Sequence, residues 1–334
     1  MQIAHFKRSL AVALLATFSL GSQAQNITFA FPYTSLKVFG DSLSDSGNNA
    51  IVLGSSGGAP TSNLYVPSGA AYASGTYGNG PVWVNAFAAA QGLATAATPS
   101  LAGGSNYASG GARTNDAANY PPSATAQVNS FLAGVTTLPS TGLYVIAIGG
   151  NDVRDVTQAV ATGAPSSTIG TAASAYALAV GNMVDKLQAK GAQHIVVWDA
   201  PDVGKTPVAL TLGVGFATLG TSVASAFNFA LAGRLAGEAG VIPFSIFNTV
   251  GNIVANPGAY GLVNVTDACG ALVNACSSSL GTSLFYDGIH PTAAGQTLLA
   301  NAMISTVAAA VPEPSTWLML AAGVAVLVLR RRRA

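Results

Sequence analysis

Four mostly apolar runs recur along the chain, and each is followed at once by glycine, aspartate or asparagine. Runs of this length and composition are typical of strands buried on both faces of a parallel sheet. Segments with helical composition lie between and after them. The alternation predicts an α/β domain in which helices cover both faces of a mostly parallel sheet. The expected strands are 36–39, 143–148, 194–198 and 241–247, and the expected helices are 81–93, 122–134, 167–190, 221–239 and 291–309.

The N-terminus of the 334-residue chain has the pattern of a secretory signal peptide. Lys7 and Arg8 precede an apolar stretch at 10–20, and small residues up to Ala24 follow it. A first core helix is disfavoured, because the basic pair stands directly against the apolar stretch. We therefore expect residues 1–24 to be cleaved on export. Residues 25–310 show no internal repeat and no linker, so we expect them to form one domain.

The C-terminus combines a Pro-Glu-Pro motif at 312–314, an apolar stretch at 317–329 and four arginines at 330–333. The thirteen apolar residues are fewer than the ~20 that a membrane span needs. Arginines in such a cluster tend to remain on the cytoplasmic side. This arrangement resembles the PEP-CTERM sorting signal. The resemblance implies that 311–334 sorts a bacterial protein to the surface through an exosortase-type enzyme. The alternative is a plain membrane anchor, transient or permanent.

Charge is scarce in this sequence. Only 7% of the residues are Asp, Glu, Lys or Arg, against about 25% in typical soluble domains. The two end segments contain six of the 13 basic residues and one of the 12 acidic ones, so the remaining domain has a net charge of about −4. A domain of this charge lacks the basic patch that nucleic acids require, which argues against a nucleic-acid partner.

The two cysteines, Cys269 and Cys276, lie close together in a loop-like region. In an exported chain such a pair is expected to form a disulfide that closes a small loop. A metal site would need further ligands, and no histidine is near in sequence. We therefore predict no metal and no cofactor.

A possible nucleophile follows the first predicted strand, where Gly40-Asp41-Ser42-Leu43 would hold Ser42 at the carboxyl end of the sheet. Active sites of open α/β sheets form at that edge, although Gly, Asp and Ser also make ordinary turns. A Gly-x-Ser-x-Gly pattern at 54–58 is rejected as a nucleophile elbow. That elbow requires a strand before it and a helix after it, and residues 59–63 do not begin a helix.

A serine hydrolase also needs a base, and the chain has three histidines. His5 leaves with the signal peptide, and His194 belongs in a strand, where a packing role fits better. His290 is therefore the candidate base, unless it is a surface loop residue. Asp287 lies three residues earlier, a spacing that returns its carboxylate to the imidazole and orients the ring.

Three donors for an oxyanion follow the predicted strands: the Ser42 N–H, a backbone N–H near Gly111 and the side-chain amide of Asn151. Each has a simpler interpretation as well. Gly110-Gly111 also makes a tight turn, and Asn151 also caps a helix. The residues alone do not decide between Gly110 and Gly111.

Taken in order, Gly-Asp-Ser-Leu, the glycine-rich segment ending in Gly111, Gly-Gly-Asn-Asp and Asp-Gly-Ile-His resemble the motifs of the GDSL, or SGNH, hydrolase family. Its four invariant positions are matched by Ser42, Gly111, Asn151 and His290. The resemblance spans residues 36–305. It implies a flavodoxin-like three-layer α/β/α fold and metal-free hydrolysis of acyl esters, with Ser42 as nucleophile, His290 as base, Asp287 as its orienting group, and Ser42, Gly111 and Asn151 at the oxyanion.

The expected function is that of an exported serine esterase or lipase at the bacterial surface, in the outer envelope or in the extracellular matrix. An esterase that deacetylates an extracellular polysaccharide is the enzymatic alternative. A surface or matrix protein that keeps the fold without turnover is another. Specificity is expected from long loops at 48–80, 112–140 and 204–220.

Overall fold

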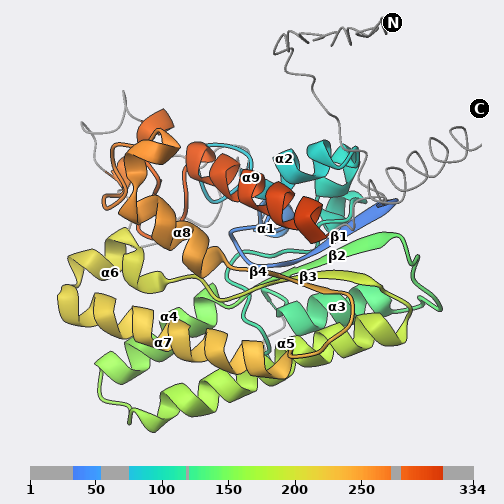
Figure 1. Cartoon of the computed structure of the whole chain (residues 1–334), viewed down its shortest axis with the longest axis horizontal. Coiled ribbons are helices and arrows are strands. Elements are labelled where there is room, and N and C mark those ends of the chain that lie inside the picture. Colours follow the sequence, from blue (N-terminus) through green and yellow to red (C-terminus); the bar gives the residue numbers. More distant parts are fainter. Residues whose placement is uncertain (1–32, 54–74, 118–119, 272–279, 311–334) are drawn as a thin grey trace, which may run out of the picture.

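The computed structural model describes residues 33–53, 75–117, 120–271 and 280–310. The predicted signal peptide, the C-terminal sorting segment and Cys276 lie outside these residues, so the structure does not test what the sequence indicates about them. Figure 1 shows the described part as a central sheet with helices on both sides.

The sheet has four strands, β1 (Ser35–Gly40), β2 (Gly142–Ala147), β3 (His194–Trp198) and β4 (Val241–Phe244), which lie side by side in this order. All three strand pairs are parallel. The carboxyl ends of the four strands therefore lie at one edge. The predicted strands are confirmed, except that β4 is shorter than the run at 241–247.

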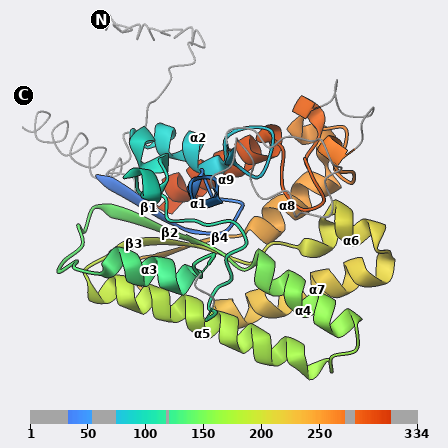
Figure 2. The same ribbon diagram turned by 180° about the vertical axis from the view of Figure 1, so that it is seen from behind.

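Alternate side chains of each strand pack into different layers. On one face Phe39, Ile146 and Val197 join a core with α3 (Ala124–Leu132), α4 (Gly150–Ala161), α5 (Ser167–Ala189) and α7 (Val214–Arg234). On the other face Val38 and Val145 pack against α2 (Trp83–Ala90) and α9 (Ala293–Ala310). Figure 1 shows these two helical layers on opposite sides of the sheet, and Figure 2 shows the same arrangement from behind. The predicted three-layer α/β/α fold is confirmed.

Among the described residues, four helices, α1, α4, α6 and α8, were not anticipated in the sequence, and short 3-10 turns connect several elements. The bounds are Asn48–Leu53 for α1, Pro207–Thr211 for α6 and Ile246–Ala255 for α8, with 3-10 turns at Ala94–Ala97, Ser100–Ala102, Val203–Lys205, Pro257–Tyr260, Cys269–Ala271 and Leu280–Thr282.

The prediction of a loop at 204–220 is wrong, because this segment holds α6 and the first turns of α7. Pro207 is the first residue of α6, and the Thr206 hydroxyl accepts the N–H of Ala209 at 3.4 Å. The glycines near the start of α7 disfavour a helix on propensity alone. Packing overrides that preference, since Gly220 is buried tightly against Val203 and Gly204.

The early end of β4 has a local cause. The chain leaves β4 after Phe244 because the Ser245 hydroxyl accepts the N–H of Asn248 at 3.0 Å and starts α8. Strand patterning does not reveal this side-chain hydrogen bond. The glycine-rich segment at 103–112 forms no strand of the sheet and pairs with β1 through a single bridge, Val38 to Asn106.

Candidate active site

The turn after β1 is built to present Ser42 at the carboxyl edge of the sheet. Gly40 ends the strand so close to the Ala147 carbonyl of β2 that a side chain would collide with it. The Asp41 carboxylate then accepts the N–H of Leu43 at 3.0 Å, which closes a tight turn around Ser42. Ser42 is 8% exposed, and it lies at the wall of a pocket.

His290 and Asp287, distant from Ser42 in sequence, complete a chain of hydrogen bonds. The Ser42 Oγ lies 2.7 Å from His290 Nε2, and His290 Nδ1 lies 2.6 Å from Asp287 Oδ2. Asp287 and His290 are buried. The arrangement has the geometry of a nucleophile, a base and a group that orients the base. The structure therefore brings together the three residues that the sequence singled out.

The Asp287 carboxylate is fixed by the turn that it begins. Its Oδ1 accepts the N–H of Ile289 at 2.7 Å and the N–H of His290 at 2.6 Å. Burial by itself raises the pKa of this carboxyl. The charge and hydrogen bond of His290, together with the two backbone N–H groups, outweigh burial and hold the pKa of Asp287 below its ordinary value. An ionised Asp287 requires its partner Nδ1 to carry a proton, which leaves Nε2 as the acceptor for the serine proton.

The glycine-rich segment runs beside β1 and reaches the same edge. Its Tyr107 N–H donates to the Val38 carbonyl at 2.8 Å, and its Ser109 N–H donates to the Gly40 carbonyl at 3.1 Å. Gly111 has a φ of +81°, a conformation that favours glycine. The segment therefore delivers its two glycines next to the serine turn.

Asn151 joins this segment from α4. Its side-chain nitrogen donates to the Ala112 carbonyl at 2.8 Å, and the side chain lines the same pocket as Ser42. One residue later, the Asp152 carboxylate accepts the Thr114 N–H at 3.1 Å. The first turn of α4 is thus tied to the residues that directly follow the two glycines.

A pocket with a cavity volume of about 90 Å³ opens beside the serine. Polar and charged groups that include Ser42, Asn151 and His290 line it together with apolar side chains, many of them from α6, α7, α8 and α9. The apolar lining includes Val208, Phe216, Ile246, Val250, Phe285 and Leu299. Such a site combines a few polar groups with an apolar slot, as small-molecule sites usually do.

Sequence reasoning overlooked Asp41 as an ionisable group of the site. This carboxylate is buried and lines the pocket. Burial raises its pKa to about 6, an effect that the Leu43 N–H and the nearby charge of His290 reduce in part. Its position inside the Gly-Asp-Ser-Leu motif was visible, but only the fold shows that it is enclosed.

The remaining candidate residues lie elsewhere. His194 begins β3, where its ring packs against Tyr33 with 5.2 Å between ring centroids, as expected for a packing role. Cys269 is buried, and its N–H donates to the carbonyl of Phe285, which lies two residues before Asp287; its predicted partner Cys276 lies outside the described residues. Among the residues that the structure describes, no group of three or more His, Cys, Asp or Glu side chains is placed to hold a metal ion.

Comparison with known proteins agrees with this geometry. Residues 36–303 match the family described as GDSL-like lipase/acylhydrolase. The chain belongs to this family. Residues 310–333 match the PEP-CTERM protein-sorting motif, which indicates export and surface sorting in bacteria. Both resemblances drawn from the sequence are confirmed.

Proteins described as esterases or lipases are among the relatives of this member of the GDSL family. Esterase EstA of Pseudomonas aeruginosa is 31% identical over 352 residues, which cover 91% of this chain and 50% of that protein. Lipase 1 of Photorhabdus luminescens is 35% identical over 182 residues, which cover 54% of this chain and 24% of that protein. The chain thus spans about half or less of the length of these relatives.

Proposed function

We propose that this protein is an exported serine esterase that hydrolyses acyl esters at Ser42. The observation that carries the proposal is the continuous hydrogen-bonded chain from Ser42 Oγ through the His290 ring to Asp287, with distances of 2.7 and 2.6 Å. A serine hydroxyl is a weak nucleophile unless a base lies within hydrogen-bonding distance of it. Family membership and the names of the relatives support the same reaction class.

In the first half of the reaction, His290 Nε2 takes the Ser42 proton as Oγ bonds to the ester carbonyl carbon. The carbonyl oxygen becomes an oxyanion. When the tetrahedral intermediate collapses, the bond to the leaving oxygen breaks, and the His290 proton passes to the departing alcohol. Ser42 then carries the acyl group. A water molecule attacks this acyl-enzyme with His290 again as base, and the carboxylic acid leaves as Ser42 regains its proton.

The oxyanion is assigned to the N–H groups of Ser42 and Gly111 and to the side-chain amide of Asn151. Gly110 is the adjacent alternative to Gly111. Its N–H donates to Asp45 Oδ2 at 2.9 Å, so it is already committed. This contact favours Gly111 as the donor. Each such donor contributes roughly 3 kcal/mol to transition-state stabilisation in well-studied hydrolases.

The apolar part of the pocket favours an acyl chain as the group beside the serine. This supports a lipase or short-chain acyl esterase over the two other functions considered, a polysaccharide deacetylase and a surface protein without turnover. A series of p-nitrophenyl esters from acetate to laurate separates them. A lipase gains activity with chain length, a deacetylase prefers acetate, and a protein without turnover cleaves none.

The two ends of the chain support a location outside the cytoplasm. The PEP-CTERM match favours delivery to the cell surface, outer envelope or extracellular matrix through an exosortase-type enzyme. The predicted signal peptide at 1–24 provides the entry into export. We infer that the C-terminal segment holds the protein at the membrane, transiently or permanently, until it is sorted.

An active-site label tests the proposal. A fluorophosphonate probe is expected to modify the wild-type protein and not Ser42→Ala, which should fold, be exported and lose ester hydrolysis. Ser44→Ala is the matched control. Ser44 is buried two residues away, and its Oγ accepts the Trp83 indole N–H at 3.0 Å, so this variant loses stability but should keep most activity. If the fluorophosphonate probe does not label well-folded wild-type protein, the proposal is wrong.

A further inference from the structure

The side chain of Asn49, in the first turn of α1, uses its complete hydrogen-bonding capacity inside the protein. Its amide nitrogen donates to the Gly110 carbonyl at 2.8 Å and to the Tyr77 hydroxyl at 2.7 Å. Its amide oxygen accepts from the Ser109 hydroxyl at 2.5 Å and from the Tyr120 hydroxyl at 2.7 Å. Two donated and two accepted bonds fix the orientation of this amide. Asn49 is 2% exposed, so bulk water does not compete for these partners.

The contact with Gly110 bears on the adjacent residue. The Gly110 carbonyl and the Gly111 N–H belong to one peptide group, which is trans. In a trans peptide the C=O and the N–H point in opposite directions. A carbonyl held against Asn49 therefore turns the Gly111 N–H away from Asn49. A hydrogen bond at the carbonyl also polarises the peptide and makes its N–H a stronger donor.

Asp45 holds the same peptide segment from its other end. Its Oδ2 accepts the Gly110 N–H at 2.9 Å and the backbone N–H of Asn49 at 3.2 Å. Its Oδ1 accepts the N–H groups of Gly47 and Asn48. The carboxylate is fully buried. Gly110 is thus fixed at both its N–H and its carbonyl, and the start of α1, which carries Asn49, is fixed to the same carboxylate.

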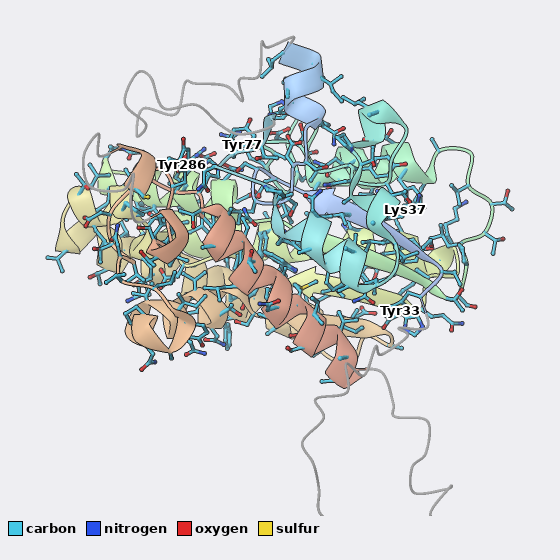
Figure 3. All side chains as sticks on the ribbon, turned by 90° about the horizontal axis from the view of Figure 1, so that it is seen from above. Tyr33, Lys37, Tyr77 and Tyr286 are labelled. Carbon is cyan, nitrogen blue, oxygen red and sulfur yellow. The ribbon has the colours of Figure 1, made fainter. Side chains whose placement is uncertain are left out.

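Tyr77 links this cluster to the base. Its ring lies against the His290 ring, with 5.1 Å between centroids and an interplanar angle of 36°. Gly110 has no space for a side chain because Tyr77 packs directly against it. In the view of Figure 3, Tyr77 lies on the same side of the molecule as Tyr286, the residue before Asp287, and Tyr33 and Lys37 lie on the other side. The cluster therefore contacts both the base and the glycine segment.

We propose that Asn49 is a positioning residue that directs the Gly111 N–H at the oxyanion of the reaction. The inference rests on the proposed ester hydrolysis at Ser42. Asn49 itself does not act on the substrate. Its effect passes through one peptide group, so its loss should weaken stabilisation of the transition state and leave ground-state binding of the ester unchanged.

The neighbouring residue Asn48 offers a matched control. It has the same side chain, lies in the same turn and is 4% exposed. Its amide nitrogen donates to the Asn106 and Ala108 carbonyls, both at 2.8 Å, upstream of the two glycines. Asn48→Ala and Asn49→Ala therefore remove buried hydrogen bonds to the same segment, but only the second releases the peptide between Gly110 and Gly111.

The experiment compares full-length wild type with these two variants on p-nitrophenyl acetate. Asn49→Ala is expected to lower kcat by about 10- to 100-fold with KM within about twofold, less than the 10²- to 10³-fold loss when an oxyanion donor is removed. Asn48→Ala is expected to keep kcat within about twofold. An alkyl trifluoromethyl ketone, whose adduct with serine carries an oxyanion, should bind Asn49→Ala more weakly by a factor similar to the loss in kcat.

Each other outcome overturns the inference. Equal losses of kcat in both variants would show that kcat depends on the order of the whole glycine-rich segment and not on the peptide group between Gly110 and Gly111. An unchanged kcat, or unchanged inhibition by the ketone, would remove the link between Asn49 and the oxyanion. If Asn49→Ala does not fold, Tyr120→Phe decides. It removes one bond to Asn49 from a partly exposed side chain, and a kcat equal to that of wild type refutes the proposal. Inactive wild type refutes the proposed function as well.

Discussion

Replacement of Asp287 by asparagine tests how the base is oriented, because the amide has the shape of the carboxylate but not its charge. In the structure, Oδ1 accepts two backbone N–H groups, from Ile289 and His290, and Oδ2 faces His290 Nδ1. In Asp287→Asn the amide oxygen should stay on the two N–H donors. The NH₂ group then faces Nδ1, which must act as an acceptor, so the ring proton moves to Nε2. A protonated Nε2 cannot take the serine proton.

The size of the loss follows from the cost of turning the amide around. The opposite orientation restores the useful tautomer, but it leaves two buried N–H donors without acceptors, at about 1–3 kcal/mol each. The two donors together cost about 2–6 kcal/mol. Because each 1.36 kcal/mol changes a population tenfold, only about 1/30 to 1/10⁴ of the variant molecules hold the amide in the useful orientation. We expect kcat to fall within this range, whose upper limit matches the effect of the same change in serine proteases, about 10⁴.

The assay is hydrolysis of p-nitrophenyl acetate at neutral pH, with circular dichroism to verify the fold. Asp199→Asn is the matched control. Asp199 follows β3, where its carboxylate accepts from the Ser245 hydroxyl and from the Phe247 N–H. Neither partner is Ser42, Asp287 or His290. That variant should keep kcat within about threefold. If Asp287→Asn retains more than one tenth of the wild-type kcat, Asp287 does not set the tautomer, and the reasoning fails.

The remaining predictions concern Gly110, Gly111 and Asp41. Gly111→Ala should lose about 1–2 kcal/mol of stability, measured by denaturant unfolding, because φ is +81° there. Gly110→Ala should lose at least as much stability and should also lower kcat more than tenfold, because its methyl group would collide with Tyr77. Equal kcat values for Gly110→Ala and Gly111→Ala would contradict this prediction. Burial raises the pKa of Asp41 from 3.8 to about 6 in the folded protein. The contribution of the protonated carboxyl to folding stability is therefore fully present below about pH 3.8 and is lost as pH rises through about 6. Asp41→Asn escapes this loss, so its stability relative to wild type should increase by up to about 3 kcal/mol between about pH 4 and about pH 7. A pH-independent difference would show that Asp41 does not titrate in this way.

The class of fold and the candidate site residues could both be predicted from local patterns in the sequence. The apolar runs at β1, β2 and β3 are buried on both faces of the sheet, and their composition alone predicts a parallel sheet. Parallel strands place their carboxyl ends at one edge, so Ser42 and Asn151 had to meet there. The spacing of Asp287 and His290 is local, and a turn of three residues suffices to join them.

The surroundings of these residues depend on contacts that form only in the folded protein. Asn49 and Tyr77 carry no signal in the sequence, because their roles depend on contacts with Gly110 and His290 across long stretches of chain. The start of α7 within 204–220 was overlooked for a related reason, because its glycines disfavour a helix locally and are accommodated only by tertiary packing. Local patterning indicates which segments become strands. The directions of individual N–H groups and the shape of the pocket depend on the packing of segments that are far apart in the sequence.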